Sequence, residues 1–249
     1  MAEHRRLLER ASILLVEDDA ALRAAIAQAL AGLGASVTEA DDGRSAFAIA
    51  REKPEPFELV VADIEMPRMS GLELFAAIRQ LKPPHGQMPI LAITGFTDPA
   101  QTRRIREAGA DAIVQKPVPP MGDLARVLRW LILAGPGRAD VDLVAFFGLQ
   151  QAIGWDALTR VMERIPIDLD KAGAALDTAL DQRDAAAVSG SCHMIVGVGG
   201  VIGAEGVTGL ARETSAAAKS GDWSATRRLA ARLRLACEGL RGFARYVTG

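Results

Sequence analysis

Residues 11–133 alternate between short strand-like segments, most of them apolar, and stretches in which apolar residues recur at helical spacing. The short segments are SILLV (12–16), GASVTEA (34–40), FELVVAD (57–63), MPILAIT (88–94) and AIVQKP (112–117). The helical stretches include residues 22–33, 71–81, 99–110 and 121–133. Strands that alternate with helices pair in parallel, because each helix carries the chain back across the sheet. We therefore predict an α/β doubly wound, five-stranded parallel sheet with helices on both faces.

The second half of the chain has a different pattern. The segment AGPGRAD (134–140) is a linker by its glycine and proline content, and no strand-like run bounded by turns follows it. Alanine-rich and leucine-rich helical patterns follow instead: 142–153, 156–165, 167–184, the segment around His193, and 222–247. We therefore predict two domains, 11–133 and 141–249, the second an all-α helical bundle of four helices with short loops.

Composition excludes several classes of protein. The 249 residues are 49% hydrophobic and have a net charge of −2, which gives no electrostatic reason to bind nucleic acid or a membrane surface. The chain contains no apolar run of about 18 residues that would span a bilayer, and ILLV is too short for the core of a signal peptide. Two cysteines cannot form a disulfide framework and suit a reducing compartment. These features predict a cytoplasmic protein.

Polar residues stand at the ends of the predicted strands. Glu17 and Asp18 follow the first strand, Asp63 ends the third, and Thr94 and Lys116 follow the fourth and fifth. The carboxyl ends of parallel strands meet at one edge of a sheet, where ligands bind. Converging carboxylates repel one another unless a hard cation such as Mg²⁺ neutralises them. A lysine and a hydroxyl beside them suit an added anionic group, so the pattern indicates phosphoryl transfer to a carboxylate.

The acids also have a structural interpretation. Acidic residues directly after a strand often cap the next helix, and Asp18 or Asp19 could cap the first one. A pair of acids alone would favour capping. Five residues of the required types in this order, each at a strand end, favour a site.

Four stretches of the first half resemble the receiver domain of two-component response regulators. They are ILLVEDDAALR, VVADIEMPRMSG, ILAITG and QKP, and they extend over nearly all of residues 11–133. The resemblance implies a flavodoxin-like fold in which Asp63 is the phosphoacceptor, and a cis peptide bond between Lys116 and Pro117. It further implies a Mg²⁺ ion bound by Glu17, Asp18, Asp63 and the backbone carbonyl of Glu65, with Thr94 and Lys116 contacting the phosphoryl group.

One position departs from the receiver pattern. The family places an aromatic switch residue three positions before the lysine, and this chain has Ile113 there. The usual coupling of Thr94 to the rotation of an aromatic ring is therefore not expected.

The segment SCHMIVGVGGVIGA (191–204) resembles histidine phosphotransfer (HPt) domains. The matching residues are His193, Ile195, Gly197, Gly203 and Ala204, and the resemblance implies that His193 carries a phosphoryl group. On a helix one face would consist of Ser189, His193, Gly197, Gly200 and Ala204. These small residues would leave the imidazole accessible, while an adjacent apolar face, Val188, Cys192, Ile195 and Ile202, would be buried.

The HPt resemblance is incomplete. Val196 replaces the usual lysine three residues after the histidine, and the acidic residue often found near Ser215 is absent. The segment has two other interpretations: a structural or surface histidine, and a glycine-rich nucleotide loop. The nucleotide loop is disfavoured because no strand precedes GVGGVIG and its spacing does not fit G-x-G-x-x-G.

Together these features predict a phosphorelay protein of two-component signal transduction. Asp63 accepts a phosphoryl group from a partner such as a sensor histidine kinase, and His193 exchanges one with an aspartate of this or another receiver. No ATP site is recognisable, so we expect a phosphoryl carrier rather than an autonomous kinase. Two alternatives stay open: a non-catalytic module whose bundle docks a histidine kinase, and a metal-dependent phosphohydrolase. The sequence leaves the partner receiver or HPt protein and the oligomeric state open.

Overall fold

A computed structural model describes residues 7–95, 98–134 and 141–248 of the chain. Backbone contacts divide the protein into two compact units, Met1–Ala139 and Asp140–Gly249, and each is described by itself. The predicted linker, 134–140, lies outside the described residues except for its first position.

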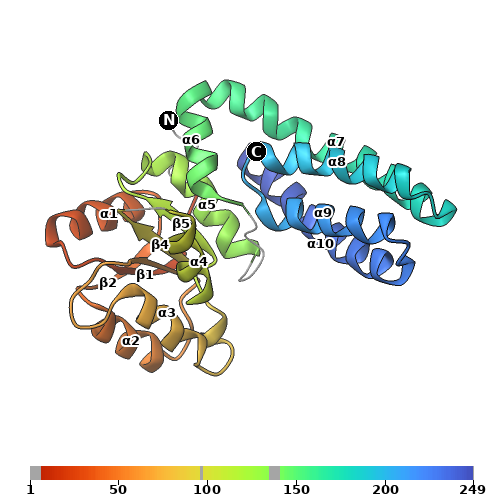
Figure 1. The fold of residues 1–249 in the computed structure, drawn as a ribbon. Coiled ribbons are helices and arrows are strands. Elements are labelled where there is room, and N and C mark those ends of the chain that lie inside the picture. The colour runs from red at the N-terminus through yellow and green to blue at the C-terminus, as the bar shows by residue number, and fades with distance from the viewer. Residues whose placement is uncertain (1–6, 96–97, 135–140, 249) are drawn as a thin grey trace. The chain divides into compact units, whose positions relative to one another are not determined.

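The first unit contains the predicted five-stranded sheet. The strands are β1 (Ser12–Val16), β2 (Ser36–Ala40), β3 (Leu59–Asp63), β4 (Ile90–Thr94) and β5 (Ala112–Gln115). All neighbours pair in parallel in the order β2-β1-β3-β4-β5. The prediction of a parallel, flavodoxin-like sheet is therefore confirmed, and the carboxyl ends of its strands lie at one edge (Figure 1).

Helices cover both faces of this sheet (Figure 1). They are α1 (Ala20–Gly32), α2 (Gly43–Glu52), α3 (Gly71–Arg79), α4 (Pro99–Glu107) and α5 (Met121–Ala134). Apolar residues from α2, α3 and α4 form one buried cluster with alternate strand residues such as Leu14, Val60 and Ala92. Helix α1 packs against α5. Alternate strand residues point to opposite faces, so each strand contributes to two apolar layers.

Helix α2 was not among the predicted helices. Its core face consists mainly of alanines, Ala46 and Ala50, which are fully buried, and this pattern is weaker than a stripe of leucines. Asp42 caps the helix by accepting a hydrogen bond from the Ser45 backbone N–H at 2.7 Å. That N-cap, placed one residue before Gly43, is the signal from which the helix could have been predicted.

The second unit is all-helical, as predicted. Its helices are α6 (Leu143–Ile153), α7 (Trp155–Gln182), α8 (Ala185–Val201), α9 (Glu205–Lys219) and α10 (Trp223–Thr248). Helices α7, α8, α9 and α10 pack as a closed ring, in which each helix contacts the next and α10 contacts α7 (Figure 1). Helix α6 adds to this bundle, since Phe146 packs edge-on against Phe243 with ring centroids 5.2 Å apart.

The patterns at 156–165 and 167–184 belong to one helix rather than two. Helix α7 runs for 28 residues with Pro166 inside it. A proline within a helix costs about 3 kcal/mol because it removes a hydrogen bond and crowds the preceding turn. Buried residues on both sides of the proline, including Met162, Ile165 and Leu169, continue one apolar stripe into the same bundle core, and this burial offsets that cost.

The longest helices of the second unit carry charged faces. Helix α10, with 26 residues, includes six arginines and one glutamate, and α7 has charges along its whole length. Throughout the part of the chain that the structure describes, no helix combines the length and the apolar composition needed to cross a bilayer.

Candidate functional site

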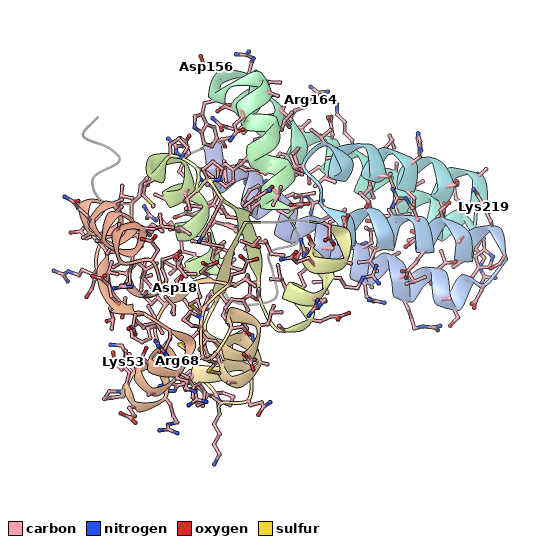
Figure 2. All side chains as sticks on the ribbon, turned by 60° about the vertical axis from the view of Figure 1, so that its left-hand side comes forward. Asp18, Lys53, Arg68, Asp156, Arg164 and Lys219 are labelled. Atoms are coloured by element: carbon pink, nitrogen blue, oxygen red, sulfur yellow. The ribbon has the colours of Figure 1, made fainter. Side chains whose placement is uncertain are left out.

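Three carboxylates converge at the carboxyl edge of the sheet. Asp63 is the last residue of β3, and Glu17 and Asp18 directly follow β1. Strands β1 and β3 pair with Val16 opposite Ala62, so the two strands end at the same level. One carboxylate oxygen from each of the three acids lies within 4.8 Å of the others. Glu17 and Asp63 are buried, whereas Asp18, which Figure 2 labels, is exposed.

Among the residues that the structure describes, Lys116 provides the one lysine ammonium that contacts this cluster. Its Nζ donates to Asp63 Oδ2 at 2.7 Å and to Glu17 Oε2 at 3.1 Å. The sheet positions this lysine, because the Lys116 backbone N–H donates to the carbonyl oxygen of Thr94 at 2.7 Å just beyond β5. The peptide bond between Lys116 and Pro117 is cis, as the receiver resemblance implies.

Charge is not balanced within the cluster. Burial raises the pKa of the Glu17 carboxyl, and the negative charge of Asp63 raises it further, against the effect of Lys116. Burial lowers the pKa of Lys116, but its hydrogen bonds and ion pairs with Asp63 and Glu17 outweigh burial and raise it. Three carboxylates thus share one ammonium group, and this excess of oxygen ligands and negative charge fits a hard divalent cation.

The chain around Asp63 is tightly packed. The Glu65 backbone N–H donates to Asp63 Oδ1 at 3.3 Å, while the Glu65 side chain is exposed. Gly71, the first residue of α3, donates its N–H to the carbonyl oxygen of Ile64 at 3.0 Å. A Cβ atom on Gly71 would lie 2.3 Å from the carbonyl oxygen of Asp63. Only glycine therefore fits where α3 meets the end of β3.

Thr94 and Ile113 occupy the positions expected from the sequence. Thr94 ends β4 and is fully buried, and Gln101 of α4 donates from Nε2 to its Oγ1 at 3.4 Å. Ile113 is 4% exposed and belongs to the apolar cluster between the sheet and α2, α3 and α4. An aliphatic side chain in the core thus stands where the resemblance would place an aromatic switch.

Two contacts lie beside the cluster. The sequence left the first of them open between Asp18 and Asp19, and it did not predict the second. Asp19, rather than Asp18, caps α1, because its Oδ1 accepts from the backbone N–H groups of Ala21 and Leu22 at 2.8 and 2.9 Å. These bonds lower the pKa of Asp19. Arg23 donates to the carbonyl oxygen of Glu17 at 2.7 Å. An arginine one turn after a capping aspartate is the signal that points to this second contact.

His193 belongs to the second unit and is exposed on α8. Within the described residues, no hydrogen bond or ion pair joins its imidazole to another group. A Cβ atom added to Gly197 or Gly200 would meet nothing within 4 Å, so packing does not require glycine at either position. Apart from His193, α8 carries no titratable side chain except the buried thiol of Cys192, whose pKa burial raises to about 11. The imidazole thus stands exposed on a helix that has no permanently charged side chain of its own.

The predicted faces of this helix are confirmed with one correction. Val188, Cys192, Ile195 and Ile202 are all buried, as expected. Ala204 does not share the face of His193, because α8 ends at Val201 and Ala204 is fully buried at the start of α9. The helix ends there because Gly203 takes a positive φ of 65° and turns the chain.

Comparisons with known proteins give the following matches. A family model described as the response regulator receiver domain matches residues 13–128. The sensor histidine kinase AruS of Pseudomonas aeruginosa is 34% identical over 193 residues, which cover 73% of this chain but 19% of the kinase. The response regulator MprA of Mycolicibacterium vanbaalenii is 39% identical over 106 residues, 42% of this chain and 43% of that protein. The chain thus spans well under two thirds of either relative.

A solved structure is also similar. It is the receiver domain of a sensor histidine kinase from Pseudomonas aeruginosa, with a magnesium ion coordinated in its active-site cleft. It is 27% identical to this chain and covers 49% of it, and the match includes 98% of that domain, with a TM-score of 0.45.

Proposed function

Residues 13–128 form a response regulator receiver domain of two-component signalling, and from this premise we propose that the whole chain is a phosphorelay protein. Asp63 accepts a phosphoryl group, and the helical unit acts as an HPt domain that exchanges one through His193. The observation that carries the proposal is the convergence of Glu17, Asp18 and Asp63 with Lys116.

The acceptor reaction uses groups already in place. A carboxylate oxygen of Asp63 forms a bond to phosphorus while the bond between phosphorus and the donor imidazole nitrogen breaks. The imidazole leaves with the electron pair and takes up a proton. Lys116, 2.7 Å from Asp63 Oδ2, neutralises charge on the transferred oxygens, and Thr94 offers a hydroxyl to one of them. Positioning and charge neutralisation supply most of the catalysis in phosphoryl transfer.

The acidic cluster fits Mg²⁺. Glu17, Asp18, Asp63 and the backbone carbonyl of Glu65 would hold the ion, since the three carboxylates approach within 4.8 Å with one ammonium group to offset them. When bound, the ion offsets the negative charge of the incoming phosphoryl oxygens. Lys116 then orients the acceptor oxygen of Asp63.

Two observations support the HPt role of the helical unit. His193 is exposed beside small residues that leave room for an approaching aspartyl phosphate. The similarity to the sensor kinase AruS covers 73% of the chain, which is more than the first unit contains, and therefore extends into the helical unit. A neutral imidazole is a competent nucleophile near pH 7.

The test is to assign phosphate by its chemical stability. Acyl phosphate is lost in base, whereas phosphohistidine is lost in acid and survives base. The wild type, Asp63→Asn and His193→Gln are treated with a phosphorylated histidine kinase or receiver, and retained label is measured after acid and base. We expect Asp63→Asn to lose the base-labile label and His193→Gln to lose the acid-labile label. Label on neither residue with any cognate donor would end the proposal.

A non-catalytic module is the second candidate function. It is favoured by Val196, which is half-buried where the HPt pattern has a lysine, and by the lack of charge on α8. In that case Asp63 takes label and His193 does not, and His193→Gln still binds the kinase with wild-type affinity.

A further inference from the structure

A phosphoryl group on His193 needs a cation that α8 does not provide. Helix α8 contains no lysine or arginine, and Val196 is half-buried. We propose that Arg212 of α9 supplies this charge and binds the phosphoryl oxygens on His193. The inference deepens the proposed HPt function and depends on it for the source of the phosphoryl group.

Two contacts fix how α8 and α9 lie side by side. The hydroxyl groups of Ser189 and Ser215 are 2.9 Å apart. A Cβ on Gly199 would lie 3.0 Å from Cγ2 of Thr208. Ser189 precedes Gly199 on α8, whereas its partner Ser215 follows Thr208 on α9. The two helices are therefore antiparallel between these two contacts.

His193 and Arg212 both lie inside that interval. His193 is one turn after Ser189 on α8, and Arg212 is three residues before Ser215 on α9. Residues spaced by three or four share a helix face, so both belong to the stripes that border the α8–α9 contact. Both side chains are exposed, and they lie at the same level of the bundle.

Arg212 has no competing partner. Within the described residues, no ion pair or hydrogen bond joins its guanidinium to another group. A planar guanidinium with several N–H donors suits two phosphoryl oxygens at once.

The other basic residues near α8 are placed less well. Arg160 and Arg164 of α7 line a groove of about 460 Å³ with Gly197 and Val201, toward the carboxyl end of α8, and Arg164 also pairs with Asp168 at 3.1 Å. Lys219 is the last residue of α9, and Figure 2 shows it at the right-hand end of the helical unit. Arg183 precedes α8 and lies ten residues before His193. Lys171 of α7 is a closer rival, on the helix that packs on the other side of α8.

Phosphoramidate tests the assignment without a protein donor. A ring nitrogen of His193 forms a bond to phosphorus, the bond from phosphorus to the amino group breaks, and ammonia leaves. We expect Arg212→Gln to slow acid-labile labelling of His193 roughly tenfold, because one charge-assisted hydrogen bond is lost. Arg212→Lys should keep most of the rate, and Val196→Lys should restore it in the Arg212→Gln background. Unchanged thermal melting shows that these variants fold.

Matched controls make the result specific. Arg232→Gln removes an exposed charge from α10, which packs against α7 and α9, and should leave the rate unchanged. An unchanged rate in Arg212→Gln, or slower labelling in Lys171→Gln alone, would overturn the assignment. Wild-type protein that phosphoramidate cannot label at His193 would overturn it as well.

Transfer from a phosphorylated receiver, measured in parallel, tests the proposed function separately. Labelling by phosphoramidate that depends on Arg212, combined with failure of every receiver donor, would reject the relay and keep the charge assignment.

Discussion

The two residues proposed to carry phosphoryl groups have opposite surroundings. Asp63 is 4% exposed, bonded to Lys116 and surrounded by two further carboxylates. His193 is exposed on a helix without permanently charged side chains, and the described residues give its imidazole no partner. The acceptor site is thus organised before a phosphoryl group arrives, whereas the imidazole of His193 has no bonded partner among the described residues before it reacts.

This difference predicts different responses to substitution. Changes around Asp63 disturb groups that already contact one another, so they should affect both stability and chemistry. Side chains added beside His193, at Gly197 or Gly200, would contact no neighbouring group. Substitutions there should therefore affect phosphoryl transfer between proteins more than folding.

Removal of Lys116 should have the largest effect. Lys116→Ala leaves buried Glu17 and Asp63 without their ammonium partner, and losing one preorganised charge typically slows a reaction about 100-fold or more. We expect labelling of Asp63 by acetyl phosphate to fall by about that factor. Mass spectrometry of the acyl phosphate measures it, and His193→Gln is the control with an intact receiver. A labelling rate within threefold of the wild type would contradict the assigned role of the lysine.

Gly71→Ala should destabilise the first unit next most strongly. The added methyl group would lie 2.3 Å from the carbonyl oxygen of Asp63, and forced overpacking costs about 1–3 kcal/mol. Urea unfolding followed by a probe in the first unit measures the loss. An alanine variant as stable as the wild type would show that the end of β3 tolerates displacement.

Asp42→Ala should reduce stability by about 1 kcal/mol, the usual value of an N-cap. Hydrogen bonds from Ser45 and the ion pair with Arg68 lower the pKa of Asp42 to about 2 from its usual 3.8. A lowered pKa means that the stabilisation is present above pH 3.8 and is lost as the pH falls through 2. The free energy of unfolding is measured for wild type and variant at pH 5, 3 and 2. The difference between the two proteins should be largest at pH 5. A constant difference at all three values would contradict the linkage.

Gly197→Ala should have the smallest effect on stability, and a favourable one. Nothing lies within 4 Å of the added Cβ, and alanine stabilises a helix interior by about 0.5–1 kcal/mol relative to glycine. Transfer to His193 from a receiver should nevertheless slow, because the methyl group projects beside the imidazole, while labelling by phosphoramidate stays unchanged. Equal rates of transfer from the receiver to the wild type and to Gly197→Ala would show that Gly197 does not keep the imidazole of His193 accessible.

The sequence predicted the sheet because four of its strands are largely apolar runs that end in a turn or a polar residue, and because the more polar β2 follows a glycine that ends the preceding helical pattern. It also predicted the order of groups at the strand ends, since the carboxyl ends of parallel strands meet at one edge. It did not predict α2, whose core face is mostly alanine, or the continuity of α7 through Pro166, where tertiary burial outweighs a local preference.

Finer details of the site depend on geometry that a sequence does not contain. Both Asp18 and Asp19 precede α1, and only the backbone path decides that Asp19 caps it. The bonds from Arg23 and Gln101 depend on side-chain conformation. Ala204 was placed on the wrong face because the turn at Gly203 ends α8 before the helical spacing reaches it.

The absence of fixed charge on α8 has a consequence for recognition. A phosphoryl group brings roughly −1.5 to −2 charge at pH 7, and on this helix it has no background of aspartate or glutamate to obscure it. Modification would thus add negative charge to a helix that has no acidic side chain of its own. A partner that carries a few basic residues could then distinguish the two forms by long-range attraction alone, before any side chain makes contact.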